Sequence, residues 1–273
     1  MRFKSCMVLL PLLALLGACN QEALTLAETR QALDEVAGAN QALNVASGTV
    51  EITTHFTIGQ ALADAAEELR TFILSQLPCA EVVRDGAKLT ITYGAHAGNC
   101  TYLGQTYTGS HSVEVKSTTS GDLRVHHEWD QVSNSKFSVT GTADVTWSAA
   151  EGSRQVVHEL HWTKLPGGFE VVGSGDRTQT ALPAGIIEGI AESGTRQWTS
   201  EAGKWTLAIS GMEIRWSDPV PQAGTYVLST PFNGKVLTMS FARVDQDTIA
   251  VTVTTGRITF HFNVNKAGTV TNG

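Results

Sequence analysis

Residues 123–147 read LRVHHEWDQVSNSKFSVTGTADVTW, and this stretch decides the fold. Apolar and polar side chains alternate along both of its halves, and a short polar connection joins them. Alternation with period two is typical of a strand with one buried face, and short connections join antiparallel neighbours. Residues 154–162, RQVVHELHW, follow the same pattern. The stretch therefore predicts consecutive strands of one antiparallel sheet.

A weak internal repeat extends this pattern, since residues 121–147 align with residues 152–179 after one shift in the turn. A hairpin of about 32 residues recurs, which favours a sheet grown from similar hairpins. From Cys79 onward we see no alternation of strands with helices, which argues against α/β enzyme folds. The remaining candidate strands are AEVVR, AKLTITYG, SHSVEVKST, FEVVGSGDRTQ, KWTLAISGMEIRW, TYVLST, KVLTMSFARV, TIAVTVT and RITFHFNV.

Two N-terminal segments, residues 22–46 and 58–77, instead repeat apolar residues at helical spacing. Thr25 and Glu28 form a capping box at the start of the first, and Pro78 ends the second. We expect a short strand between them, over residues 50–56. The predicted fold class is mainly β (α+β), with N-terminal helices packed on a large antiparallel β-meander, either an open barrel or a sandwich. We expect one domain, residues 26–273, with a helical part (26–78) and an antiparallel β part (79–273).

The N-terminus has the pattern of a secretion signal. Arg2 and Lys4 precede an apolar run over residues 7–16, which is shorter than the ~20 residues that a transmembrane helix needs. The run ends in LGAC at residues 16–19, which resembles the lipobox of bacterial lipoproteins. An ordinary signal, with Cys19 as an unmodified thiol, is the alternative.

The lipobox resemblance implies that residues 1–18 are a signal peptide and that Cys19 is acylated, with diacylglycerol and a further chain such as palmitate. Residues 19–25 would then be a lipid-anchored tether. Asn20 stands where an aspartate suggests inner-membrane retention, so the resemblance implies an outer-membrane location in the cell envelope. Two acyl chains hold a protein firmly on a membrane, whereas one binds it marginally.

The body of the chain resembles uncharacterised β-rich lipoproteins of myxobacteria. The likeness rests on CAEVV, GNCTY and DPVPQAGTY and on the segments TGTADVTW and GDRTQT. It covers most of the chain after the signal. Because no activity is known for that group, the resemblance implies a kind of protein and no reaction.

The net charge limits the classes of binding partner, and the cysteine content indicates how the cysteines pair. Without Arg2 and Lys4 the 19 basic side chains fall to 17 against 26 acidic ones, so the body carries a net charge of −9 and no nucleic acid is expected to bind. The expected partner is membrane lipid, through acylated Cys19; a protein, glycan or lipid ligand stays undefined, and no cofactor is expected. In an exported chain, Cys79 and Cys100 predict a disulfide, which would stabilise the fold by roughly 3 kcal/mol. We prefer this interpretation to a metal site formed by the two cysteines and His96.

The period of two places the histidines on opposite faces. His127 and His158 fall on the apolar face, on either side of Ala143 in the register that matches all three strands. Two imidazoles there have no third ligand for a metal, so we interpret them as core histidines. The tryptophans also fall mainly on apolar positions, except Trp198.

The opposite, polar face places His126 across from Asp144, with Glu128, Glu159 and His161 near by. Such a set could bind a divalent cation or perform acid–base chemistry, but a solvated face with cross-strand pairs is the preferred interpretation. HELH at residues 158–161 lacks the HExxH spacing, and we find no nucleophile elbow or P-loop.

We therefore expect a lipid-anchored cell-envelope lipoprotein with a binding or structural role, not an enzyme, with no catalytic or metal-binding residue assigned. The first alternative is a carrier of a lipid or other apolar ligand between the helices and a concave sheet. The second is a metal-dependent hydrolase that uses His126, Glu128, Glu159 and His161.

Overall fold

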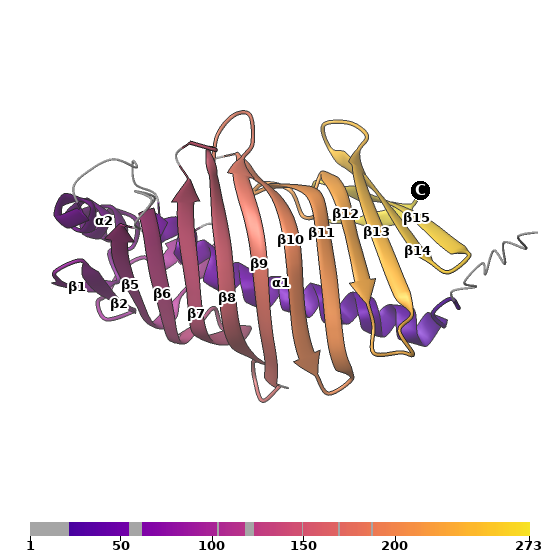
Figure 1. Cartoon of the computed structure of the whole chain (residues 1–273), viewed down its shortest axis with the longest axis horizontal. Helices are drawn as coiled ribbons and strands as arrows, with labels where there is room; N and C mark the ends of the chain where they lie inside the picture. The colour runs from indigo at the N-terminus through magenta and orange to yellow at the C-terminus, as the bar shows by residue number, and fades with distance from the viewer. Residues whose placement is uncertain are drawn as a thin grey trace, which may run out of the picture.

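The computed structural model describes residues 22–54, 62–102, 104–117, 123–148, 150–168, 170–186 and 188–273. Within these residues fourteen strands form one antiparallel sheet, in the order β1-β2-β5 and then every strand in sequence to β16 (Figure 1). A separate pair, β3 and β4, lies between β2 and β5 in the chain. The end strands β1 and β16 do not pair in the described chain, so the sheet is open and not closed into a barrel. The predicted fold class, β-rich α+β with a large antiparallel sheet, is confirmed.

The strands are β1 (Glu81–Asp85), β2 (Lys88–Tyr93), β3 (Thr101–Tyr102), β4 (Gln105–Thr106), β5 (Thr108–Ser117), β6 (Leu123–Ser133), β7 (Phe137–Ser148), β8 (Ser153–Lys164), β9 (Glu170–Ala181), β10 (Gly189–Ser200), β11 (Gly203–Arg215), β12 (Ala223–Ser229), β13 (Val236–Arg243), β14 (Thr248–Thr255), β15 (Ile258–Asn265) and β16 (Val270–Asn272).

The register of the central strands follows the sequence pattern. His127 pairs with Ala143, and Ala143 pairs with His158, as the alternation predicts. A β-bulge between Trp129 and Val132 shifts the end of the β6–β7 hairpin by one residue, which the alternation does not reveal. Gln131, inside the bulge, has a positive φ of 52°. A bulge adds one residue to one strand and increases the local twist without changing which face the earlier residues occupy.

The first helix, α1 (Leu26–Thr54), is longer than expected, and the predicted strand over residues 50–54 is wrong. Residues 55 and 56 of that prediction lie outside the described residues. Val50 and Ile52 are buried as part of the helix, so packing decides the structure of a short apolar segment that fits either period. The capping box is confirmed: Thr25 N donates to Glu28 Oε2 (2.7 Å), and Glu28 N donates to Thr25 Oγ1 (3.2 Å).

The second helix, α2 (Leu62–Gln76), matches the expected one, of which residues 58–61 lie outside the described residues. Its predicted apolar positions Leu69 and Ile73 are buried, and so is Leu77 just after it. The helix packs at the β1 end of the sheet (Figure 1). The predicted disulfide between Cys79 and Cys100 is also present, with Cα atoms 5.3 Å apart.

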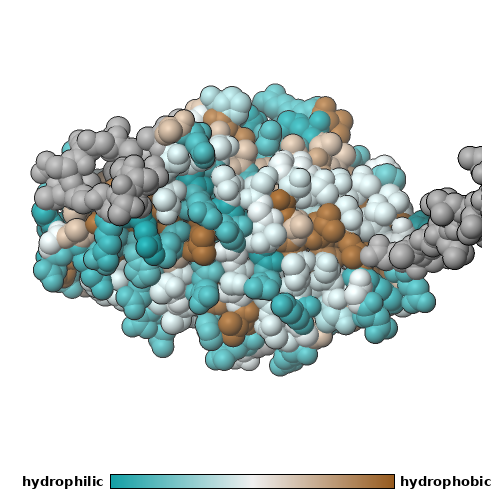
Figure 2. All heavy atoms as spheres, in the orientation of Figure 1, coloured by the Kyte–Doolittle hydropathy of each residue, from teal (hydrophilic) through white to brown (hydrophobic). Residues whose placement is uncertain are grey.

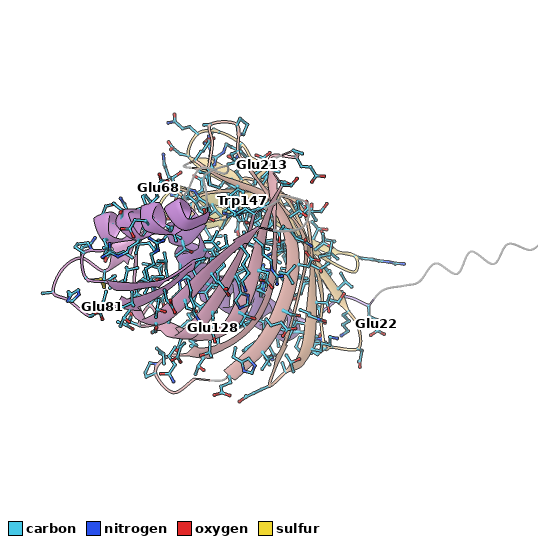
Figure 3. All side chains as sticks on the ribbon, turned by 60° about the vertical axis from the view of Figure 1, so that its left-hand side comes forward. Glu22, Glu68, Glu81, Glu128, Trp147 and Glu213 are labelled. Atoms are coloured by element: carbon cyan, nitrogen blue, oxygen red, sulfur yellow. A yellow bond between two sulfur atoms is a disulfide. The ribbon has the colours of Figure 1, made fainter. Side chains whose placement is uncertain are left out.

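The sheet curves around α1, which crosses its concave face from the last strands to the first (Figures 1 and 3). At the start of the helix, Leu24 N donates to Thr255 Oγ1 at the end of β14 (2.8 Å). Near its C-terminal end, Thr49 Oγ1 accepts a hydrogen bond from Trp129 Nε1 of β6 (2.7 Å). The buried positions of the helix include several small residues, which let it lie close to the strands: Ala32, Ala39, Ala42 and Ala46. The core is therefore the layer between α1 and the concave face.

On the face shown in Figure 2, hydrophilic side chains and side chains of intermediate hydropathy prevail, and apolar ones lie in small separate groups. None of the helices in the described part of the chain is long and apolar enough to cross a membrane.

Candidate binding pocket

The polar face predicted from the alternation is the outer face of the sheet, where Glu128 lies (Figure 3). His126 Nδ1 is 2.9 Å from Asp144 Oδ1, and Arg124 Nη2 is 2.7 Å from the other carboxylate oxygen. Partial burial raises the pKa of Asp144, but its hydrogen bonds to Arg124 and His126 lower it more, so the net pKa is below its ordinary value. This is the cross-strand ion cluster of a solvated face.

The other candidate residues of that face form no metal-ligand set within the described chain. Glu128 is 3.9 Å from Lys88 Nζ and accepts a hydrogen bond from Ser112 (3.3 Å). Glu159 faces Thr142 and His161 faces Thr140 on the neighbouring strand. In the part of the chain that the structure describes, no three His, Cys, Asp or Glu side chains lie close enough to hold a metal ion. The structure therefore does not bring His126, Glu128, Glu159 and His161 together as the ligands of one metal ion.

On the inner face His127 and His158 are buried, which confirms their predicted direction. They belong to two different surroundings. His127 Nδ1 is 3.2 Å from His111 Nε2, and His111 Nδ1 is 3.3 Å from the hydroxyl of Tyr93. Both imidazoles stack with Trp129, with ring centroids 5.1 and 5.6 Å away. We call Tyr93, His111, His127 and Trp129 the histidine cluster.

Burial keeps the histidine cluster neutral. It lowers the pKa of His111 to about 3, and it lowers that of His127 well below the ordinary value, helped by the neighbouring positive groups. Burial likewise raises the pKa of Tyr93. A buried charge is costly, so these groups stay uncharged and bond with one another and with α1, where Thr53 Oγ1 is 3.4 Å from His127 Nδ1. The period of two also places His111 on this face, in phase with Val113 and Val115.

His158 faces a separate pocket of about 200 Å³ between the middle of α1 and the concave face. We call it the arginine pocket, because Arg154 of β8, Arg177 of β9 and Arg196 of β10 line it. Its other wall residues come from α1, from β6 to β12 and from the segment after β11. These include Asn40, Leu43, Asn44, Ser47 and Glu51; Val156, Leu160, Gln179, Ile190, Glu192 and Ile214; and Trp216, Asp218 and Tyr226.

Glu192 and Glu51 neutralise two of the arginines. Arg177 Nη1 is 2.7 Å from Glu192 Oε2, which also accepts a hydrogen bond from Gln179 (2.6 Å). Arg154 pairs with Glu51 of α1 and donates from Nε to Gln179 Oε1 (2.8 Å). Burial raises the pKa of Glu192, but Arg177 and Arg196 lower it more, so the net pKa is below its ordinary value and the carboxylate stays ionised.

Arg196 has no such partner. Its side chain is buried, with 6% of the residue exposed, and among the described residues no carboxylate lies within ion-pair distance of it. Nη2 donates to Asn40 Oδ1 (2.6 Å), and the guanidinium carbon lies 6.0 Å from the ring centroid of Tyr226. Burial lowers the pKa of Arg196, although arginine stays protonated in proteins. Asp218, the third acidic residue of the wall, pairs with Arg243. The pocket therefore retains one uncompensated positive charge.

Buried atoms without a hydrogen-bond partner also gather at this pocket. His158 Nδ1, Arg177 Nε and Arg196 Nε all belong to residues of its wall. Leaving a buried polar group without a hydrogen bond costs about 1–3 kcal/mol, more for charged groups, so native structures usually satisfy such atoms with protein or water. Three of them around one pocket mark the place where a polar ligand would supply partners.

Gly175 lets the third arginine approach the histidine. On β9 it pairs with His158 on one side and with Arg196 on the other. A Cβ atom at this position would lie 2.5 Å from His158 Cε1 and 3.0 Å from Arg196 Cγ. The glycine-rich segment VGSGD (residues 172–176) is part of β9, and Gly175 within it allows a close approach of side chains.

Sequence reasoning missed the arginine pocket, although a signal was present. Arg154 shares the period-two face of Val156 and His158, and Arg177 shares that of Val171. Charged residues in phase with a buried face are the signal of a buried polar site. The alternation also does not predict β10, because Glu192 and Arg196 occupy its inner face. Trp198, the unassigned tryptophan, is buried on the same strand and stacks on Trp205 with centroids 6.2 Å apart.

Comparison of the chain with protein-family models, with curated proteins and with solved structures finds no match. The site's chemistry therefore rests on its own geometry.

Proposed function

We propose that the protein is a lipid-anchored protein of the cell envelope that binds a small ligand in the arginine pocket and catalyses no reaction. The observation that carries the proposal is the arginine pocket itself, in which buried charges from α1 and three strands surround an open volume. Buried ion pairs are costly to assemble, so stabilisation of the fold alone is a weak explanation for them. Binding of a ligand that meets the unpartnered atoms of the wall is a stronger explanation.

The size and chemistry of the pocket favour a small polar ligand over a lipid. Pockets for drug-sized molecules usually measure about 300–1,000 Å³, whereas this one has about 200 Å³. A lipid carrier needs a long apolar channel, whereas three arginines and three acidic residues line this pocket. We therefore prefer small-ligand binding to the carriage of a lipid.

The ionisation of the wall supports a binding role. Burial lowers the pKa of His158 to about 2, with a further contribution from Arg177 and Arg196, so this imidazole is a weak base at neutral pH. An efficient general base has a pKa near the working pH. Glu51 and Glu192 are held in ion pairs with Arg154 and Arg177, so their carboxylate oxygens are occupied and are poorly placed to accept a proton from a substrate.

The proposed anchor is close to the body. Cys19 precedes Glu22 by three residues, so its Cα lies within about 11 Å of Glu22 even in an extended chain. Glu22 lies at the end of the molecule where α1 begins (Figure 3). An acyl chain on Cys19 would therefore hold that end of the sheet next to the membrane surface.

Fractionation tests the anchor. The wild-type chain should sediment with membranes and resist extraction by high salt, whereas Cys19→Ala should be found in the soluble fraction with its fold intact by circular dichroism. A Cys19→Ala chain that sediments as the wild type does would refute the lipid anchor.

A blocked pocket tests ligand binding. Asn44 is exposed on α1 and lines the pocket, so it lies at the mouth, and Asn44→Trp would fill the mouth without a buried substitution. Gln41 is exposed on the same helix outside the pocket, which makes Gln41→Trp the matched control. Ligand-observed NMR with a library of small acids, amides, amines and sugars should show hits that disappear in Asn44→Trp and persist in Gln41→Trp. A library without such hits would contradict the proposed function.

A further inference from the structure

We infer that the ligand of the arginine pocket is a small organic monocarboxylate with a compact apolar body, whose carboxylate pairs with Arg196. The inference rests on the proposed binding function and names the chemical class of the ligand. Three lines of observation carry it: the charge balance of the wall, the free hydrogen-bonding capacity of Arg196, and the apolar surface opposite the arginines.

The charge balance points to a single negative charge. Among the described residues of the wall, Arg154 pairs with Glu51, Arg177 pairs with Glu192, and Asp218 pairs with Arg243 outside the wall. Arg196 is the cation that these pairs leave over. A monoanion would complete the balance, whereas a phosphate dianion would bring an excess negative charge into a buried site, which is costly.

The geometry of Arg196 suits a carboxylate. A guanidinium presents a planar fork of donors that matches the two oxygens of a carboxylate. Asn40 accepts from Nη2, and the ring of Tyr226 lies against the guanidinium, so the fork is held in one place. Nε has no hydrogen-bond partner within the described chain, and His158 Nδ1, across Gly175, has none either. Both atoms are buried beneath the pocket wall, so an oxygen of the ligand reaches them only after a small shift of the side chains, with the proton of His158 on Nδ1.

The remaining wall suits a compact apolar body. Val156, Leu160, Ile190 and Ile214 contribute aliphatic side chains, and Trp216 adds an aromatic one. An apolar cavity of about 150 Å³ accommodates benzene in another protein. The volume here, about 200 Å³, leaves room for a ring of that size together with a carboxylate. Benzoate is therefore the probe that represents the class.

Binding of three probes to the wild-type protein separates charge from shape. Benzoate, benzamide and benzylamine share the ring and carry a negative, neutral and positive head group, respectively. In titrations followed by two-dimensional NMR at pH 7, benzoate should shift the indole signal of Trp216. Benzamide should bind about tenfold to 100-fold more weakly, the change expected for losing a charged hydrogen bond, and benzylamine should not bind.

Variants of Arg196 assign the charge. Arg196→Met should weaken benzoate binding by about tenfold to 100-fold, and Arg196→Lys, which keeps the charge without the fork, should weaken it less. Arg124→Met removes an exposed arginine on the outer face and should leave benzoate binding unchanged. If Arg196→Met does not fold, Arg196→Lys and the benzamide comparison still decide the result.

The possible results separate the two proposals. If benzamide binds as tightly as benzoate, or Arg196→Lys and Arg196→Met bind benzoate as the wild type does, the pocket binds ligands but the carboxylate inference is wrong. If none of the three probes nor any library compound gives a response that Asn44→Trp abolishes, the binding function itself is wrong. Benzoate binding that depends on both Arg196 and an open mouth supports both.

Discussion

Two buried polar regions lie side by side on the concave face of the sheet, and they differ in whether their buried side chains are charged. In the histidine cluster, Tyr93, His111 and His127 are uncharged and bond with one another. In the arginine pocket, side chains keep their charges and balance them in pairs, with Arg196 left over. Trp129 lies at the boundary of the two regions, because it belongs to the histidine cluster and also lines the arginine pocket.

The comparison teaches that burial alone does not mark a site. Each member of the histidine cluster has at least one hydrogen bond to a neighbour or to α1, although His127 Nε2 has no partner among the described residues. The arginine pocket has open volume, a surplus charge and unpartnered donors. Only the arginine pocket combines space for a ligand with a charge that a ligand would neutralise. We therefore assign a structural role to the histidine cluster and a binding role to the arginine pocket.

The largest effect should come from breaking a charge pair in the pocket. Glu192→Gln keeps the shape but leaves Arg177 without its carboxylate, which should lower the free energy of unfolding by about 3–5 kcal/mol in urea denaturation. Glu128→Gln, on the outer face, removes a carboxylate 3.9 Å from Lys88 and should cost less than about 1 kcal/mol. Equal losses in the two variants would mean that the pocket's charges are not buried as described.

Acidification should act on the histidine cluster. The pKa of buried His127 lies well below the ordinary 6.5 of the unfolded chain, so below pH 6.5 the unfolded state binds the proton and the folded state does not. The stability from the neutral imidazole is complete above pH 6.5 and declines as the pH falls, by up to about 2 kcal/mol at pH 5.

His127→Gln measures this contribution. The difference in the free energy of unfolding between pH 7 and pH 5 should be about 2 kcal/mol smaller in the variant than in the wild type. His96→Gln, at an exposed loop position, is the control. An unchanged pH dependence in His127→Gln would show that this imidazole is not held neutral.

A smaller effect is expected where the cluster meets α1. Thr49→Val is nearly isosteric but removes the acceptor of the Trp129 indole, so it should cost about 1 kcal/mol in the free energy of unfolding. The fluorescence of the indole should also respond, because Trp129 loses its hydrogen bond. A variant as stable as the wild type, with unchanged fluorescence, would show that this hydrogen bond does not stabilise the histidine cluster.

The smallest effect on stability should come from Arg196. Because this arginine has no carboxylate partner among the described residues, Arg196→Met should change the free energy of unfolding by less than about 1 kcal/mol or increase it. Chemical denaturation in the absence of ligand gives the value. A loss as large as that of Glu192→Gln would reveal that Arg196 is needed by the empty protein, which would weaken its assignment to a ligand.

The sequence predicts the part of this architecture that depends on local pattern. Alternation in residues 123–162 was sufficient for the meander, for the inward direction of His127 and His158, and for their positions around Ala143. The disulfide was predicted from Cys79 and Cys100 together with the expectation that the chain is exported. These features depend on the pleat and on short connections, which neighbouring residues determine.

The arginine pocket depends on contacts that no local pattern contains. Arg154 meets Glu51 across 103 residues, and Arg196 meets Asn40 across 156. The same long-range packing turns Val50 and Ile52, which alternate as a strand does, into the last turns of α1. Pairings of this kind appear only once the helix is placed against the sheet.

The position of α1 also sets the order in which the molecule can be completed. Almost every strand pairs with its neighbour in the chain, so the sheet can grow hairpin by hairpin as residues emerge. The helix comes first in the chain, yet Leu24 bonds to Thr255, 231 residues later. The start of the helix is therefore fixed only after β14 has formed. The pocket needs the helix and the strands up to β12, since Tyr226 lines it, so ligand binding reports that the helix has packed against the assembled sheet.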